Sequence, residues 1–230
     1  AYQLVLSSGE KSQTGAYYTP KNIVQSLVEK IIQKDKKFLE PCSGVGFFCV
    51  EYIKTYLKNF KCLPIGLVFA NDIDAFAARI TELNIQAISN GQMIGNVFNQ
   101  NALELNLNGF DIVLTNPPYG IKNDFVDMKT KEIFSHFIYR TLDKFLSPYG
   151  EMCFVLPISI LSVAKHKEIR KYILDNYNIK DISHYGKSFD GVYSDIVSIT
   201  IEKKHSIDNQ VNWIDDDIKS IAQSIFIKND

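Results

Sequence analysis

The chain has 230 residues, of which 46% are hydrophobic and 22% charged, and its formal net charge is −1. This length and composition are sufficient for one large hydrophobic core. No run approaches the roughly 18 consecutive apolar residues of a membrane helix, and the first residues lack the pattern of a signal peptide. We therefore predict a cytoplasmic protein that has no membrane partner.

The predicted elements alternate between short apolar runs and amphipathic stretches, which is typical of βαβ units and a mainly parallel sheet. Helices are predicted at residues 22–32, 47–57, 75–83, 132–146 and 164–174. Strands are predicted at residues 37–40, 65–70, 93–98, 111–115, 151–156, 179–185 and 196–202, and the last two are close enough to pair antiparallel. We expect an α/β, Rossmann-like fold with a mostly parallel seven-stranded sheet, an antiparallel terminal strand and helices on both faces.

The cysteines form no CxxC pair and have no histidine at the spacing of a zinc site. The sequence therefore predicts no metal centre and no disulfide framework. Buried free thiols are expected at Cys42, Cys49, Cys62 and Cys153.

Two polar motifs follow the first two predicted strands. Glu40-Pro41-Cys42-Ser43-Gly44-Val45-Gly46 is a glycine turn where a ligand can approach the backbone, although a plain tight turn has the same pattern. Glu40 would repel a phosphate and suits a cationic amine. Asp72 ends the second strand, where a carboxylate can accept ribose hydroxyls. Its alternative role is the N-cap of the next helix, for which Asp74 is the better candidate.

Asn116-Pro117-Pro118-Tyr119 follows the strand at 111–115 and is a far more specific motif. Two prolines fix an extended turn that leaves the Asn116 side chain and the Pro117 carbonyl available as hydrogen-bond acceptors. Aimed at an exocyclic amino group, these oxygens would localise the nitrogen lone pair and make it a nucleophile without a general base. The Tyr119 ring can stack on a planar substrate, and Phe189 is a candidate for the opposite face.

Basic residues are concentrated after this motif, whereas the net charge of the whole chain offers no global attraction to nucleic acid. A solvated helix face and a set of phosphate contacts both remain open as interpretations. The residues are Lys122, Lys129, Lys131, Arg140, Lys144, Lys165, Lys167, Arg170 and Lys171.

These motifs together resemble the DNA adenine-N6 methyltransferase family, in the group whose cofactor motifs precede the catalytic one. The resemblance covers roughly residues 14–204, and Gly15-Ala16-Tyr17-Tyr18-Thr19-Pro20 looks like the family's N-terminal cofactor motif. It implies the S-adenosylmethionine-dependent methyltransferase fold, with S-adenosylmethionine as cofactor. Asn101 stands where the family usually has an aspartate that accepts from the cofactor adenine. The implied cofactor-binding residues are Tyr17, Thr19, Glu40, Pro41, Gly44, Gly46, Asp72, Ile73, Asn101, Ala102 and Asn116.

The resemblance also implies catalytic roles for Asn116, Pro117, Pro118 and Tyr119, with Tyr119 and Phe189 stacking on a flipped adenine. Double-stranded DNA is the implied partner, in a restriction-modification setting, with a separate or fused target-recognition domain or subunit and a nuclease. We expect a catalytic domain at residues 1–205. Residues 206–230 are expected to be a linker or the start of a missing recognition region, because the chain lacks an initiator Met and ends soon after the last predicted strand.

Other acceptors and roles remain open. A similar Asn-Pro-Pro-Tyr turn can hold a glutamine side-chain amide of a protein, and RNA guanine-N2 methylation uses a related turn. Cytosine-N4 enzymes usually carry serine at the position of Asn116. A non-catalytic cofactor-binding subunit is a further alternative, against which the intact motif argues.

Overall fold

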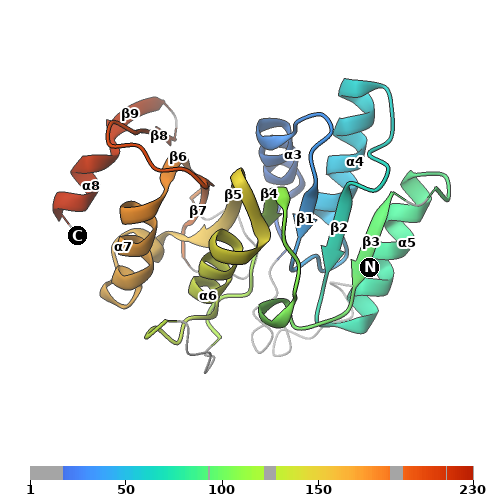
Figure 1. The fold of residues 1–230 in the computed structure, drawn as a ribbon, viewed down its shortest axis with the longest axis horizontal. Helices are drawn as coiled ribbons and strands as arrows, with labels where there is room; N and C mark the ends of the chain where they lie inside the picture. Colours follow the sequence, from blue (N-terminus) through green and yellow to red (C-terminus); the bar gives the residue numbers. More distant parts are fainter. Residues whose placement is uncertain (1–17, 93, 122–127, 187–193, 216, 230) are drawn as a thin grey trace.

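The computed structural model describes residues 18–92, 94–121, 128–186, 194–215 and 217–229. Within these ranges, nine strands form one sheet in the order β3-β2-β1-β4-β5-β7-β6-β8-β9 (Figure 1). The strands are β1 (Phe38–Glu40), β2 (Val68–Asn71), β3 (Gly95–Phe98), β4 (Phe110–Thr115), β5 (Leu146–Pro157), β6 (Asn178–His184), β7 (Ile196–Glu202), β8 (Gln210–Ile214) and β9 (Ile218–Ala222).

The sheet is mainly parallel, as the alternation of apolar runs and amphipathic stretches predicts. Strands β1 to β5 pair in parallel, and β7 is antiparallel to both β5 and β6. The predicted antiparallel pairing of the last two expected strands is therefore confirmed. The antiparallel strand does not lie at the edge, however, because β7 is inserted between β5 and β6.

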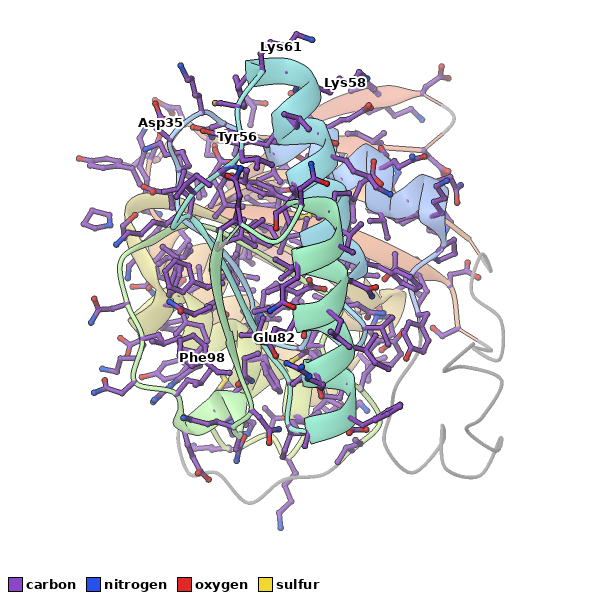
Figure 2. The ribbon with its side chains drawn as sticks, turned by 90° about the vertical axis from the view of Figure 1, so that its right-hand side faces the viewer. Asp35, Tyr56, Lys58, Lys61, Glu82 and Phe98 are labelled. Carbon is purple, nitrogen blue, oxygen red and sulfur yellow. The ribbon has the colours of Figure 1, made fainter. Side chains whose placement is uncertain are left out.

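The helices form two layers, which confirms the prediction of helices on both faces of a Rossmann-like sheet. The first layer contains α3 (Lys21–Ile31), α4 (Phe47–Phe60) and α5 (Ala75–Ile88), and Figure 2 shows α4 and α5 running side by side along one flank. The second layer contains α6 (Ile133–Arg140), α7 (Lys167–Asn176) and α8 (Gln223–Asn229). Figure 1 shows α6 and α7 in front of the half of the sheet formed by β5 to β7.

The central segments are buried on both faces of the sheet, which explains why their apolar runs form strands. Ile112, Val113 and Leu114 of β4 have no measurable exposure, and a continuous apolar run of this kind suits a parallel strand covered on both faces. On α3, the residues at helical spacing point inward, and Leu27 and Val28 are buried. Pro20 is the N-cap residue of α3, and no side-chain capping bond is present there.

The region after residue 205, for which a linker or the start of a recognition region is expected, contains two strands that extend the sheet. Strands β8 and β9 pair antiparallel and β8 pairs in parallel with β6, so the described residues form nine strands where seven are predicted. No residue of β9, Ile-Lys-Ser-Ile-Ala, is buried, so this segment carries a weak strand signal in the sequence. Helix α6 is also shorter than predicted, because a π-helical turn (Thr141–Phe145) ends it before β5 begins at Leu146.

The sheet order reverses between β1 and β4, because β2 and β3 lie on one side of β1 and β4 lies on the other. Ligands of open α/β sheets bind at such a reversal, outside the carboxyl ends of the strands. This edge is at the bottom of Figure 1, and in Figure 2 it is the edge near Phe98, opposite Asp35 and Lys61.

The cysteines are all free, but only Cys49 and Cys153 are buried, while Cys42 is half-buried. Cys62 is exposed, which corrects the expectation of four buried thiols, because it follows the C-terminal end of α4 at Lys61. Among the described residues, no helix has the length and apolar composition that crossing a membrane requires.

His166 is a buried histidine that yields a stability prediction. It has no measurable exposure, and neither ring nitrogen has a hydrogen-bond partner among the described residues. Burial lowers the pKa of His166 to about 4, with a further contribution from the charge of Lys165. The unfolded chain therefore binds the proton more readily, so stability is lost as the pH falls from about 6.5 towards about 4.

We expect His166→Phe to raise the free energy of unfolding by about 1–3 kcal/mol, because no buried polar ring remains. The substitution should also make the slope of this free energy against pH less positive between about pH 4 and 6.5. Urea denaturation at several pH values measures both quantities. The same substitution at His205, which is exposed, should leave the slope unchanged. If the slope of the free energy of unfolding against pH is the same in His166→Phe as in the parent chain, burial does not hold this histidine neutral.

Candidate active site

A cavity of about 450 Å³ lies at the carboxyl edge of the sheet, where the sheet order reverses. Its wall is built from the segments that follow β1, β2, β3 and β4, together with one face of α6. Ten of the sequence-predicted site residues line it, namely Thr19, Glu40, Pro41, Gly44, Asp72, Ile73, Asn101, Ala102, Asn116 and Pro118. The fold therefore brings both predicted motif groups to one cavity.

The glycine turn after β1 is shaped by contacts with the rest of the wall. Gly44 has a φ of 53°, its N–H donates to Asp72 Oδ2 at 2.7 Å, and its carbonyl accepts from Thr81 Oγ1 at 2.8 Å. Gly46 also has positive φ, at 81°, and begins α4. A Cβ at Gly46 would lie 2.9 Å from the Thr81 side chain, so this glycine permits close packing of α5. Gly46 does not line the cavity, contrary to its predicted place in the cofactor site.

Glu40, the last residue of β1, is almost fully buried, with 2% exposure. Its Oε2 accepts from the Cys49 backbone N–H at 3.0 Å. Burial is the largest effect on this carboxyl and raises its pKa to about 8, so the side chain is mostly neutral near pH 7. A cation placed in the cavity would favour the ionised form of Glu40.

Asp72 and Asp74 divide the two roles considered for the acidic segment after β2. Asp74 caps α5, because its Oδ1 accepts from Phe76 N at 2.8 Å and from Ala77 N at 3.3 Å. Asp72 instead accepts from the backbone N–H groups of Gly44 and Asp74, and burial raises the pKa of Asp72. The carboxylate of Asp72 therefore lies on the cavity wall rather than at the helix cap.

The cavity is acidic and partly apolar. Among the described residues, its lining includes the carboxyls of Glu40, Asp72 and Asp74 and contains no lysine or arginine, which disfavours an anionic ligand such as a pyrophosphate. Ile73 is 72% exposed at the wall and offers an apolar surface to a flat ring. This combination suits a ligand with cationic groups and an aromatic base.

Thr19 provides an independent indication of a ligand. Its side chain is buried on the cavity wall, and its hydroxyl has no hydrogen-bond partner among the described residues. A buried hydroxyl without a partner costs free energy unless a bound molecule satisfies it. Together with the acidic wall, Thr19 shows that these residues fit S-adenosylmethionine, which carries a sulfonium, an ammonium and an adenine ring.

Several predicted residues take positions other than those expected. Asn101 lines the cavity, but its Oδ1 accepts from Leu103 N at 3.1 Å and caps the short 3₁₀ helix Ala102–Glu104. Pro117 and Tyr119 do not line the cavity, and Tyr119 is only 8% exposed. Two further predicted residues, Tyr17 and Phe189, lie outside the described residues.

Several lining residues are not among the predicted site residues. Tyr18 lies on the wall next to Thr19, and burial, together with Asp72 and Asp74, raises the pKa of Tyr18 to about 12. Ile133 and Phe137 come from α6, and Ile121 lies between this helix and the catalytic motif. Apolar residues at helical spacing cannot be distinguished from core residues in a sequence, so α6 gave no signal.

Asn71 is another residue that sequence reasoning missed, and it connects three strand ends. Its side chain is fully buried, and its Nδ2 donates to Pro41 O at 3.1 Å and Gln100 O at 3.0 Å. Its Oδ1 accepts from Gln100 N at 3.1 Å. A polar residue at the end of a buried strand is the only signal in the sequence that could have identified it. Asn71 therefore holds the segments after β1 and β3 against β2.

We expect Asn71→Ala to lower the free energy of unfolding by about 2–4 kcal/mol, because three buried hydrogen bonds are lost and their backbone partners stay buried. Urea denaturation measures this change. The control is Asn176→Ala at the exposed end of α7, where one bond to Tyr172 O is lost and a change below about 1 kcal/mol is expected. Equal effects of the two substitutions would mean that Asn71 does not tie the strand ends together.

Comparison with known proteins identifies the family. The model of the N-6 DNA methylase family matches residues 1–224. The type II methyltransferase M.VspI of Vibrio sp. (strain 343) is 25% identical over 99% of this chain and 58% of its own length. The structure of the EcoKI M protein of a type I restriction enzyme has a TM-score of 0.71 and 18% identity, covering 90% of this chain and 50% of that chain.

A structure from Listeria monocytogenes that is assigned to class I S-adenosylmethionine-dependent methyltransferases has a TM-score of 0.70 and 18% identity. The match covers 92% of this chain and 74% of that chain. The architecture is thus the Rossmann-like fold of S-adenosylmethionine-dependent methyltransferases, and family and fold indicate S-adenosylmethionine as the cofactor. Because the family model covers nearly the whole chain, this protein belongs to the N-6 DNA methylase family.

Proposed function

We propose that this chain transfers a methyl group from S-adenosylmethionine to the N6 amino group of adenine in DNA, within a restriction-modification system. The observation that carries the proposal is that Asn116 and Pro118 share one acidic cavity with Glu40 and Asp72. A methyl donor and an amino acceptor must meet in such a shared cavity. Membership of the N-6 DNA methylase family and similarity to the type II methyltransferase M.VspI support the same reaction.

The cofactor side of the cavity is assigned to residues with matching chemistry. Glu40 is placed to bind the ammonium of the methionine part, and Asp72 to accept from the ribose hydroxyls. Ile73 offers its exposed apolar side chain to the adenine ring, and the Thr19 hydroxyl gains a hydrogen-bond partner from the bound cofactor. When bound, S-adenosylmethionine supplies an electrophilic methyl group on a positively charged sulfur.

The substrate side is assigned to the motif after β4. The Asn116 side-chain oxygen and the Pro117 carbonyl accept hydrogen bonds from the adenine amino group. They draw its nitrogen out of conjugation with the ring and stabilise the positive charge that develops there during transfer. The residues therefore activate the nucleophile by hydrogen bonding and need no general base before transfer. The carbon–sulfur bond breaks as the carbon–nitrogen bond forms, and the methylated nitrogen then releases its extra proton to solvent.

The target adenine has to leave the duplex, because its amino group cannot reach the cavity from within the base stack. We assign Tyr119 to one face of the extruded base and keep Phe189 as the candidate for the other. Tyr119 is buried in the structure, so its ring must become accessible when the base enters.

The partners follow from the same proposal. The chain spans 58% of the length of M.VspI and 50% of the EcoKI M protein, so a recognition region, and a nuclease, can be fused or separate. We propose double-stranded DNA as the substrate and the cytoplasm as the location. Residues 1–205 then form the catalytic domain, and residues 206–230 lead towards the recognition region while β8 and β9 extend the sheet.

The deciding experiment uses S-adenosylmethionine with a labelled methyl group. The full-length protein is offered duplex DNA, RNA and a glutamine-containing peptide, and the label is traced to the modified group. Label in DNA as N6-methyladenine is the expected result. Label in RNA or in the peptide alone would establish guanine-N2 or glutamine-N5 methylation instead, and cofactor binding without any transfer would indicate a non-catalytic subunit.

A further inference from the structure

A second, shallower hollow of about 610 Å³ lies beside the candidate active site. It is formed by residues 129–132, which lead into α6, and by residues 164–168, which include the start of α7. The described residues that line it are Lys129, Thr130, Lys131, Glu132, Ala164, Lys165, Lys167 and Glu168. We call this feature the lysine hollow.

The fold creates the lysine hollow from two sequence segments more than thirty residues apart. Lys129 and Lys131 come from the first segment, and Lys165 and Lys167 come from the second. All four side chains are exposed. In the sequence these lysines are equally consistent with a solvated helix face, but their convergence around one hollow is a tertiary feature that favours binding of an anion.

The two carboxylates of the hollow are engaged in holding its shape. Glu168 Oε2 accepts from the backbone N–H groups of Lys129 and Thr130, at 2.9 and 3.3 Å. Glu132 Oε2 pairs with Lys165 at 2.9 Å. Because lysines outnumber carboxylates two to one, the lining has a positive charge in a chain whose total charge is −1.

Glu132 also connects the hollow to the catalytic motif. Its Oε1 accepts from the Gly120 backbone N–H at 2.8 Å, and Gly120 directly follows Tyr119. The next residue, Ile133, lines the active-site cavity and donates its N–H to Ile121 O at 3.2 Å. Two neighbouring residues, Glu132 and Ile133, therefore line the hollow and the active-site cavity respectively.

We propose that the lysine hollow binds the phosphodiester backbone of DNA next to the target nucleotide; this inference rests on the proposed function. An extruded base remains attached to its own backbone, so the adjoining phosphates must pass close to the cavity that receives the base. Lysine ammonium groups are suited to phosphates as mobile point charges. Such contacts fix position and orientation without reading sequence, which suits a chain whose catalytic motif makes no choice of sequence.

The test is duplex DNA binding by the triple variant K129Q/K131Q/K167Q, which leaves the Lys165–Glu132 pair intact. Fluorescence anisotropy with a labelled duplex gives the affinity at several salt concentrations. At about 50 mM salt we expect at least about tenfold weaker binding. The slope of log affinity against log salt should fall by about 0.9 for each phosphate contact removed, which is about 2–3 for this variant.

The matched control is K34Q/K58Q/K61Q, which removes the same charge at the opposite edge of the sheet, where Figure 2 shows Lys58 and Lys61. This variant should weaken binding by less than about threefold and keep the salt slope. Both variants should bind S-adenosylhomocysteine as the parent chain does, which confirms that the fold and the cofactor side are intact.

A larger loss of affinity and salt slope in the hollow variant than in the control supports the proposal. Equal losses in the two variants, no loss in the hollow variant, or no duplex binding by the parent chain even at low salt would overturn it. Methyl transfer is not a readout of this test. A failure of the proposed function appears as label in RNA or peptide, whereas a failure of the lysine hollow appears in the anisotropy data alone.

Discussion

Asn116→Ala is expected to reduce methyl transfer by about 100- to 1,000-fold in kcat, while S-adenosylhomocysteine affinity changes little. Asn116 lies on the wall of the cavity that Glu40 and Asp72 also line. Its proposed role is to accept a hydrogen bond from the amino group that is methylated, and this bond strengthens as positive charge develops on the nitrogen. The effect therefore falls on the transition state rather than on cofactor binding. Labelled-methyl transfer and calorimetric titration measure the two quantities.

Two further variants sharpen the interpretation of Asn116. Asn116→Asp keeps acceptor oxygens at the same position and should retain at least about tenfold more activity than the alanine variant. Asn176→Ala, at the exposed end of α7, should leave kcat unchanged. Transfer at the parental rate by Asn116→Ala would remove the proposed activation of the amino group, and a large loss of cofactor affinity would move Asn116 to the cofactor side.

Glu40 is expected to make cofactor affinity depend on pH. In the ligand-free protein, burial holds the pKa of Glu40 at about 8, so the folded protein keeps a proton there that the unfolded chain releases above about 4.5. An ammonium beside Glu40 favours the carboxylate, so binding of S-adenosylhomocysteine releases this proton. Affinity should therefore rise with pH up to about 8, by at most tenfold for each pH unit.

The control for this effect is a ligand that lacks the amino acid part. 5′-Methylthioadenosine has no ammonium, and its affinity should not follow the ionisation of Glu40. In Glu40→Gln, the amide oxygen can still accept from Cys49 N, but S-adenosylhomocysteine should bind with weaker affinity and without the pH dependence. Parallel pH profiles of the two ligands in the parent chain would contradict an ammonium site at Glu40.

The same carboxyl predicts the pH dependence of stability. Because the folded protein binds the extra proton, the free energy of unfolding should fall as the pH rises from about 4.5 to about 8. Glu40→Gln should remove most of this fall, since the amide does not ionise. Urea denaturation across this pH range measures the slope, and a slope that survives the substitution would place its origin elsewhere. The ionisation of Glu40 lowers stability as the pH rises, whereas His166 lowers stability as the pH falls below about 6.5.

The predictions for the fold were most accurate where periodicity and local turn chemistry agree. The continuous apolar run of β4 predicts a strand buried on both faces. The helical spacing of the apolar residues in α3 predicts a helix with one buried face. The hairpin β8–β9 was missed, because these short strands bury only Val211 and therefore show no clear alternation of apolar and polar residues. The insertion of β7 between β5 and β6 is likewise a property of the assembled sheet.

The candidate site was predicted mainly from residues that end strands. Glu40, Asp72 and Asn116 follow three different strands, and parallel strands place such residues at one edge. Asn71 was missed although it also ends a strand, because its role depends on contacts with Pro41 and Gln100, which lie far away in the sequence.

The sequence by itself predicted the chemistry that we propose for this protein, because an Asn-Pro-Pro-Tyr turn and a glycine turn with an acidic residue each follow a strand expected in a mainly parallel sheet. Only the tertiary structure decided which residues line the shared cavity, because wall positions such as those of Ile133 and Phe137 depend on how α6 packs. The same holds for the four lysines of the hollow, whose charges act together only when two distant segments are adjacent. Periodicity reports on local geometry, whereas a cavity and its charge depend on contacts between segments far apart in the chain.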